Sequence, residues 1–220
     1  MIASELVSDT IFPVQPGERL QLLQEKMREA RLAHFPVVRY TQYLGLISED
    51  DVVAQLKEHP EAKVEGLPLE HISVYGGLHI YDVIHAFHLH QTDVLPVVDD
   101  KQQFLGMITA ADLLDYFALL TGSEEPGGII VLEVNNRDNS LAHIAQIVES
   151  DNAQIMSSYV RTFPDSTRME ITLKLNRSNI GSIVASFLRY EYDVKATFND
   201  NRSHDTTSDR YEQLMNYLNM

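Results

Sequence analysis

The same sequence pattern occurs twice, about 60 residues apart. Pro36–Val38 matches Pro96–Val98, and the two prolines are 60 positions apart. Further along, Gly45 matches Gly106 at an offset of 61. A repeat of this length indicates one structural unit per copy. Because a unit of about 60 residues buries little apolar surface alone, we expect the two copies to share a core.

Each copy predicts a helix, two strands and a second helix. Leu20, Leu23 and Met27 are spaced as on one face of a helix, and Pro is acceptable as the first residue of a short buried strand. The upstream apolar residues match pairwise at an offset of 60: Val14 with Val74, Leu20 with Ile80, Leu23 with Val83, and Met27 with Phe87.

A hydroxyl and an acid recur where the second helix of each copy begins. Gly45 is followed by Ser48 and Asp51, and the second copy has Thr109 and Asp112 at the same places. The hydroxyl can cap the free N–H groups of the helix. A helix N-terminus also suits a phosphate, and the carboxylate can accept the two hydroxyls of a ribose. Without the duplication, a cap and a first-turn acid would be the simpler interpretation.

The doubled pattern over about residues 1–120 resembles the CBS domain pair, or Bateman module. The resemblance implies clefts that bind adenosine-containing ligands, with the hydroxyl at the phosphate and the acid at the ribose. It places adenine against the backbone before each Pro strand, at Ala33-His34 and Asp93-Val94. Two further residues, on the strands leading into the repeats, are expected to line the base pockets: Val14 and Val74.

The two expected clefts differ in charge. The first helix opens with three consecutive acids, Glu49, Asp50 and Asp51, whereas the second opens Ala110-Ala111-Asp112. We therefore expect a phosphate in the second cleft. The first is expected to be empty, to bind adenosine without phosphate, or to bind cationic S-adenosylmethionine.

Thr121–Gly128 is rich in Gly, Pro and charge, which predicts a linker. The next 70 residues, 129–198, predict the order β-α-β-β-α-β of a ferredoxin-like domain. Placed after a CBS pair, this resembles an ACT domain. ACT domains usually carry Pro-Gly after the first strand, where this chain has Asp138-Asn139. Asn tolerates a left-handed turn, but the departure weighs against a bound amino acid.

The expected fold is α+β: repeat 1 over about 1–60, repeat 2 over about 66–120, and a ferredoxin-like ACT domain over 129–198. Residues 199–220 predict a polar tail that ends in a short amphipathic helix. Its apolar positions share one face: Tyr211, Leu214, Met215 and Leu218.

Composition excludes several functions. The chain has no Cys, which rules out disulfides and thiol catalysis and fits a reducing compartment. A net charge of −15 disfavours nucleic acid and anionic membranes. The N-terminal residues do not resemble a signal peptide, and we expect a cytoplasmic location. His85 and His88 are spaced to share a metal ion, but a polar helix face is the favoured interpretation.

The sequence therefore predicts a regulatory protein without catalytic activity. It is expected to bind AMP, or alternatively ATP, ADP or S-adenosylmethionine, and to pass the signal to the ACT-like domain or to a regulated protein. The domain order is similar to that of acetoin-utilisation accessory proteins, and a homodimer is expected. The alternatives are a structural assembly module with vestigial CBS clefts and an amino-acid sensor that uses the ACT-like domain.

Overall fold

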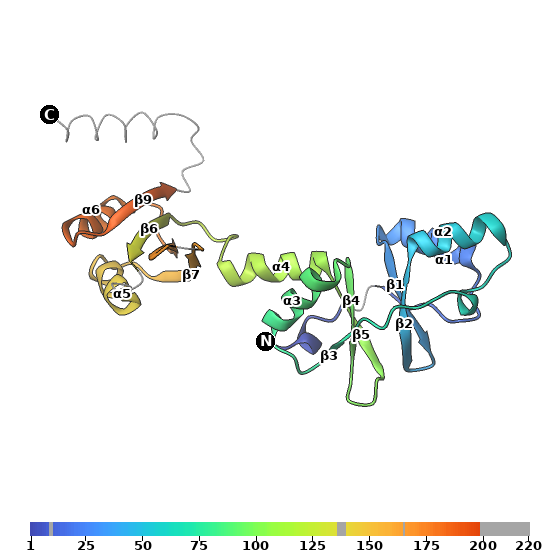
Figure 1. Ribbon diagram of the computed structural model, residues 1–220. Coiled ribbons are helices and arrows are strands. Elements are labelled where there is room, and N and C mark those ends of the chain that lie inside the picture. Colours follow the sequence, from blue (N-terminus) through green and yellow to red (C-terminus); the bar gives the residue numbers. More distant parts are fainter. Residues whose placement is uncertain (9–10, 136–139, 165, 199–220) are drawn as a thin grey trace. The chain divides into compact units, whose positions relative to one another are not determined.

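The computed structural model describes residues 1–8, 11–135, 140–164 and 166–198 (Figure 1). The chain divides into two compact units, Met1–Phe117 and Ala118–Met220, which are described separately below. Two sequence predictions lie outside the described residues: the turn at Asp138-Asn139 and the helix in the tail 199–220.

The first repeat has the predicted order of elements. Helix α1 (Leu20–Ala30) is followed by β1 (His34–Arg39), β2 (Gln42–Ser48) and α2 (Glu49–Glu58). The strands pair antiparallel, and Val14 pairs in parallel with β1. The predicted apolar face of α1 is buried in the core of this repeat.

The second repeat has the same arrangement. Strand β3 (Val74–Tyr75) precedes α3 (Ile80–His90), β4 (Val94–Val98), β5 (Phe104–Thr109) and α4 (Ala110–Thr121). The sheet order is β3-β4-β5, with β3 parallel and β5 antiparallel to β4. The register also repeats, because Val37 lies opposite Gly45 and Val97 lies opposite Gly106, each pair next to a register shift.

The segment that leads into each repeat packs on the other repeat. The 3₁₀ turn η1 (Ala3–Glu5) donates backbone hydrogen bonds to Leu78 and Gly76 of repeat 2, and Ser8 N–H donates to the Met107 carbonyl. The corresponding turn η2 (Val64–Gly66) donates to Glu18 and Pro16 of repeat 1, and the Glu70 and Leu46 backbones exchange two hydrogen bonds. We call residues 3–8 and 64–70 the crossing segments.

Each crossing segment passes directly over a glycine. Gly45 has φ +154°, and a Cβ atom there would lie 2.6 Å from Leu69 Cβ. Gly106 has φ +148°, and its Cβ would lie 2.0 Å from Val7 Cγ1. Both positions combine a backbone conformation that favours glycine with a close approach. The glycine in the doubled motif is thus required by packing, whatever the motif binds.

The repeats share little sheet structure. Among the described residues, their two sheets meet through an isolated bridge between Gln42 and Gln103 at the hairpin tips. Each repeat has a core of its own, and two small clusters join them. One cluster contains Val38, Tyr43, Val98 and Phe104, and the other is centred on Leu46, Val94 and Met107. The expectation of one shared core therefore holds only for these small clusters.

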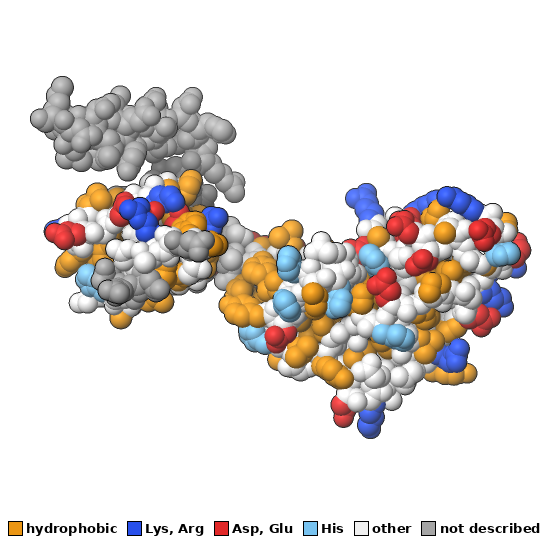
Figure 2. Space-filling model, viewed as in Figure 1, with side chains coloured by type: hydrophobic (Ala, Val, Ile, Leu, Met, Phe, Trp, Pro, Cys, Tyr) orange, Lys and Arg blue, Asp and Glu red, His pale blue; other side chains and the backbone are white. Residues whose placement is uncertain are grey.

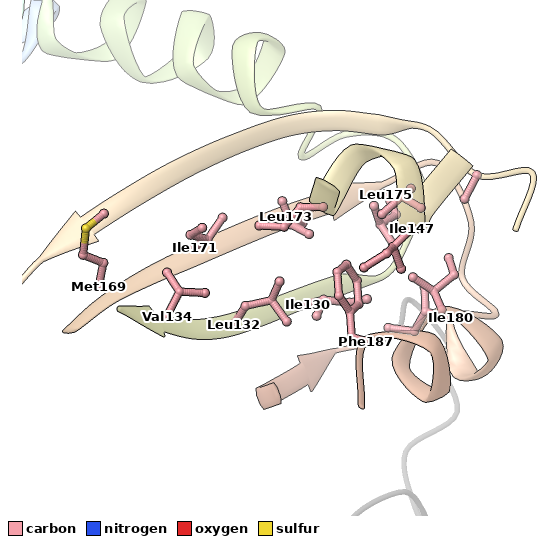
Figure 3. Packing of buried hydrophobic residues seen from close by; sticks show 14 residues of the cluster. Ile130, Leu132, Val134, Ile147, Met169, Ile171, Leu173, Leu175, Ile180 and Phe187 are labelled. Carbon is pink, nitrogen blue, oxygen red and sulfur yellow. The ribbon is translucent and has the colours of Figure 1, made fainter. Parts of the chain in front are cut away.

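The second unit has the predicted β-α-β-β-α-β order. Its elements are β6 (Ile129–Asn135), α5 (Leu141–Ser150), β7 (Ile155–Thr162), β8 (Arg168–Leu175), α6 (Gly181–Arg189) and β9 (Asp193–Phe198). The antiparallel sheet has the order β7-β8-β6-β9, and its buried residues pack with those of α5 and α6 (Figure 3). This confirms the ferredoxin-like topology.

Candidate functional site

In the second repeat, Thr109 and Asp112 form a reciprocal cap at the start of α4. The Thr109 hydroxyl and backbone N–H both donate to Asp112 Oδ2, at 2.7 and 2.8 Å, and the Asp112 N–H donates to Thr109 Oγ1 at 3.1 Å. This is the hydrogen-bond pattern of a capping box, so Thr109 and Asp112 stabilise the N-terminus of α4. These bonds use one carboxylate oxygen, and Oδ1 of Asp112 is the atom available to a ribose.

The first repeat forms the same corner with fewer bonds and more charge. The Ser48 hydroxyl donates to Asp51 Oδ2 at 2.6 Å, and the Asp51 N–H donates to Ser48 Oγ at 3.2 Å. Three acids occupy the first turn of α2, whereas Asp112 is the acid in the first turn of α4. A carboxylate near a helix N-terminus is stabilised, but it competes there with any phosphate.

Backbone hydrogen bonds hold each expected adenine position beside its hydroxyl–acid pair. In the first repeat the Glu49 N–H, next to Ser48, donates to the Ala33 carbonyl at 2.7 Å. In the second repeat the Ala110 N–H, next to Thr109, donates to the Asp93 carbonyl at 3.0 Å. The two parts predicted for one adenosine therefore adjoin within each repeat.

Asp93 also joins the two expected adenine positions to each other. Its Oδ2 accepts from the Ala33 N–H at 2.5 Å, and its Oδ1 lies 2.6 Å from His34 Nδ1. The predicted base-binding backbones of the two repeats are thus tied by one carboxylate. The sequence predicted that Ala33-His34 and Asp93-Val94 each belong to a binding site, but it did not predict the hydrogen bonds between them. The signal available in the sequence was an acid in one segment and a histidine at the adjacent position of the other.

The link perturbs both groups. The hydrogen bond to Asp93 raises the pKa of His34 against the opposing effect of burial, and the charges of Asp93, Glu70 and Asp50 add to the increase. Burial acts to raise the pKa of Asp93, but hydrogen bonds from His34 and Ala33 outweigh it, so this pKa is lowered. Both shifts favour an ion pair at the junction of the repeats.

Three predicted pocket residues lie in hydrophobic clusters. Val14, Val74 and Val94 are buried, Val14 and Val74 in the cores of their own repeats and Val94 in a cluster that joins the repeats. The Val14 backbone also donates to the Pro36 carbonyl and accepts from the Val38 N–H. Their side chains pack against other protein side chains. Contact of these valines with an adenine base stays a prediction.

The second unit contains two surface hollows. One of about 490 Å³ is lined by charged and aromatic side chains that include His143, Arg168, Tyr190 and Tyr192. His143 Nδ1 lies 2.9 Å from the Tyr192 hydroxyl, whose pKa is raised by burial. The other, of about 430 Å³, is more apolar. Among the described residues, no group of three or more His, Asp and Glu side chains is arranged to hold a metal ion.

Two copies of one strand–helix unit, each with a hydroxyl–acid pair at a helix N-terminus, define a tandem repeat of a single small module. A model of the CBS domain matches the chain twice, over residues 3–58 and 64–119. The protein therefore belongs to the CBS domain family and carries two CBS domains. Among the described residues, no helix combines the length and apolar character needed to cross a bilayer.

Solved structures with similar folds include a CBS domain pair/ACT domain protein from Thermotoga maritima, with 21% identity and a TM-score of 0.48; the match covers 54% of this chain and 98% of that one. A putative acetoin utilization protein from Vibrio cholerae has 19% identity and a TM-score of 0.49, covering 56% of this chain and 95% of that one. CBSX2, solved in complex with AMP, has 15% identity and a TM-score of 0.47, covering 54% and 96%.

Proposed function

We propose that this protein is a cytoplasmic regulator that senses an adenosine nucleotide, AMP being favoured, through its CBS pair. The observation that carries the proposal is that each hydroxyl–acid pair directly adjoins its expected adenine backbone, twice in one chain. A single capped helix would not support a ligand site, because caps are common. The bound nucleotide would act as a signal, and we expect no catalytic activity.

The second repeat is the proposed phosphate site. Asp112 is the acid in the first turn of α4, and the Ala110 and Asp112 N–H groups already donate to the Asp93 carbonyl and to Thr109 Oγ1. A phosphate would therefore be bound by the positive end of the helix and by the Thr109 hydroxyl, which would exchange its bond to Asp112 for one to the phosphate. At the first repeat, Glu49, Asp50 and Asp51 oppose an anion. A neutral adenosine or a cationic S-adenosyl ligand suits that position better than a nucleotide does.

The proposed mechanism is differential binding. A ligand that fits one arrangement of the repeats better than another shifts the population toward that arrangement. Asp93 is placed to carry the coupling, because a base that competes for the Ala33 N–H or for His34 at the first position alters a group of the second. The signal would then reach the ACT-like domain or a regulated protein.

We further propose that the protein is a homodimer. Helix α4 contains no buried residue and exposes large apolar side chains: Leu114 is 70% exposed and Leu119 is 69% exposed. Figure 2 shows hydrophobic side chains gathered over α4. Such a face on a helix favours burial against a partner. The corresponding helix of a second chain is the proposed partner.

The test is a titration calorimetry panel of AMP, ADP, ATP, NAD and S-adenosylmethionine, first with chelator and then with magnesium. Because the chain carries a net charge of −15, we expect AMP to bind more tightly than ATP in chelator. Magnesium should narrow the difference by neutralising the polyphosphate. No binding by any of these compounds would contradict the proposal and favour the assembly module with vestigial clefts. Binding of amino acids alone would favour the ACT-like domain as the sensor.

A further inference from the structure

The sheet of the second unit has one covered face and one open face. Its inward residues pack with α5 and α6 and are buried, as Figure 3 shows for Leu132, Ile171 and Leu173. The opposite face carries large apolar groups at the surface: Tyr159 is 59% exposed and Phe198 is 58% exposed. An apolar sheet face in water is a candidate for a docking surface.

The open face is hollowed. A cavity of about 430 Å³ is lined by Ile129, Val131, Tyr159 and Phe198, together with the polar residues Thr121, Ser123, Ser157, Thr172 and Lys174. The Ser157 hydroxyl donates to the Thr121 carbonyl at 2.8 Å and fixes part of the rim. The hollow is thus lined by both apolar and polar side chains, which suits the side of an amphipathic element.

The open face carries one more cation than carboxylate among the charged residues described below. Glu170 forms ion pairs with both Arg161 and Lys195, and Glu133 pairs with Arg168. Register places Asp193 on the same face opposite Glu133, while Lys174 Nζ donates to the Gly127 carbonyl at 3.2 Å. Among the described residues these positions give four cations against three carboxylates, in a chain whose net charge is −15.

The chain itself supplies an acidic, amphipathic segment at this place. The last described residue, Phe198, is a wall of the hollow, and residues 199–220 follow it in the sequence. That segment has four acids (Asp200, Asp205, Asp209 and Glu212) and two arginines (Arg202 and Arg210). Its apolar residues, from Tyr211 to Leu218, have helical spacing.

The connecting length is sufficient for the segment to return. Residues 199–210 separate Phe198 from Tyr211, and an extended chain of this length spans up to about 40 Å. A short helix is marginal in water unless its apolar face is packed. The hollow next to the point where the segment begins offers such a face.

We propose that residues 199–220 dock on the open face of the β7-β8-β6-β9 sheet of their own chain, with Leu214 and Leu218 over the hollow. The acids of the segment then face the cations around Glu170. Docking buries Tyr159 and Phe198 without a second protein.

Paired cysteines in the full-length chain provide the test, because the natural chain has no Cys. In Thr172→Cys/Leu214→Cys, one thiol stands in the hollow and the other on the apolar side of the segment. Gln146→Cys/Leu214→Cys is the first control, since Gln146 is exposed on α5. Thr172→Cys/Gln213→Cys is the second, because Gln213 lies on the polar side. Disulfide yield in a glutathione buffer is measured by mass spectrometry and non-reducing electrophoresis.

We expect the in-chain disulfide of Thr172→Cys/Leu214→Cys to form with an effective concentration about tenfold above both controls. A second pair, Tyr159→Cys/Leu218→Cys, should form its disulfide to the same extent. Tyr159 lies on the edge strand β7, so this pair keeps the test valid if Thr172→Cys prevents folding. Equal yields in all pairs would overturn the proposal. A disulfide formed only between chains would overturn it in favour of a second copy as the occupant.

Discussion

The first and second repeats have the same strand register, but the helix after each hydroxyl–acid pair has a different surface. Helix α2 begins with three acids and buries Val52, whereas α4 begins with one acid and buries no residue. The expected adenine positions also differ, since repeat 1 has Ala33-His34 where repeat 2 has Asp93-Val94.

The comparison of the repeats distinguishes residues that the fold requires from residues that can vary with the ligand. Gly45 and Gly106 are kept in both repeats because a crossing segment passes over each of them. The first turns of α2 and α4 are exposed enough to vary in charge without disturbing the cores. We therefore propose that the helix start sets the ligand preference of each repeat. The four predictions below test the comparison of the two repeats, and the second tests this assignment directly.

The largest effect is expected at the two glycines. Gly45→Ala should destabilise the protein by about 3 kcal/mol. Its Cβ would meet Leu69 Cβ and the Glu70 carbonyl oxygen, which can move only with the backbone. Gly106→Ala should cost about 2 kcal/mol, since the Val7 side chain can turn away. Urea unfolding measures both, with Gly17→Ala as the control, where a Cβ would meet nothing within 4 Å. Equal losses of unfolding free energy in the two variants would contradict this ranking and show that both crossing segments move aside equally well.

The next effect concerns the acids of the two sites. Asp112→Ala should weaken AMP binding about ten- to a hundredfold, because a hydrogen bond to a charged group is worth roughly 1.5–3 kcal/mol. Asp51→Ala should change AMP affinity less. Calorimetry measures both, and Asp115→Ala, at an exposed acid of the same helix, controls for net charge. A greater loss at Asp51 would reverse the ranking of the repeats.

Helix α4 should carry the dimer more than α2 does. Leu114→Glu should raise the dimer Kd about tenfold, because it replaces an exposed apolar side chain of α4 by a charge. Val53→Glu is the matched change, 61 residues earlier on α2, and should have a smaller effect. Light scattering over a concentration series distinguishes them. A monomeric parent chain at micromolar concentration would contradict the dimer itself.

The smallest effect is the pH dependence of the His34–Asp93 pair. Because the pKa of His34 is raised on folding, its contribution is complete below the unfolded value of about 6.5 and is lost as the pH rises through the folded pKa. The lowered pKa of Asp93 gives a contribution that is present above about 3.9 and is lost as the pH falls through the folded pKa. The pair therefore stabilises most between those limits.

His34→Gln should remove about 1 kcal/mol near pH 5.5 and less at pH 8. The measurement is urea unfolding of both chains at several pH values. His85→Gln, at an exposed histidine of α3, is the control for the loss of an imidazole. The same loss from His34→Gln at both pH values would mean that the charge of His34 does not matter.

Local patterns predicted the elements because hydrophobic spacing acts over a few residues. The apolar face of α1, the strands that begin near each Pro, and the order of strands and helices along the second unit are all visible in this way. The hydroxyl–acid pairs were also predictable, since capping joins residues three apart. Whether they bind adenosine stays a prediction.

The crossing segments and the Asp93 link were not predicted because both depend on contacts across the chain. Ser8 pairs with Met107, and Ala33 bonds to Asp93, 60 residues away. A weak signal existed for the first: Ala3 and Leu6 match Val64 and Leu67 at an offset of 61. The spacing shows that the two segments occupy equivalent positions in the two repeats. It does not show that each segment packs on the other repeat.

The crossing segments have a consequence for how the chain folds during synthesis. Residues 3–8 leave the ribosome 99 positions ahead of their strand partner, from Ser8 to Met107. Repeat 1 can complete its own core once residues 64–70 emerge, because its cover follows it closely. Repeat 2 must instead wait for a segment that was made first. Residues 3–8 therefore reach their native position in the CBS pair only after repeat 2 has been made, long after their own synthesis.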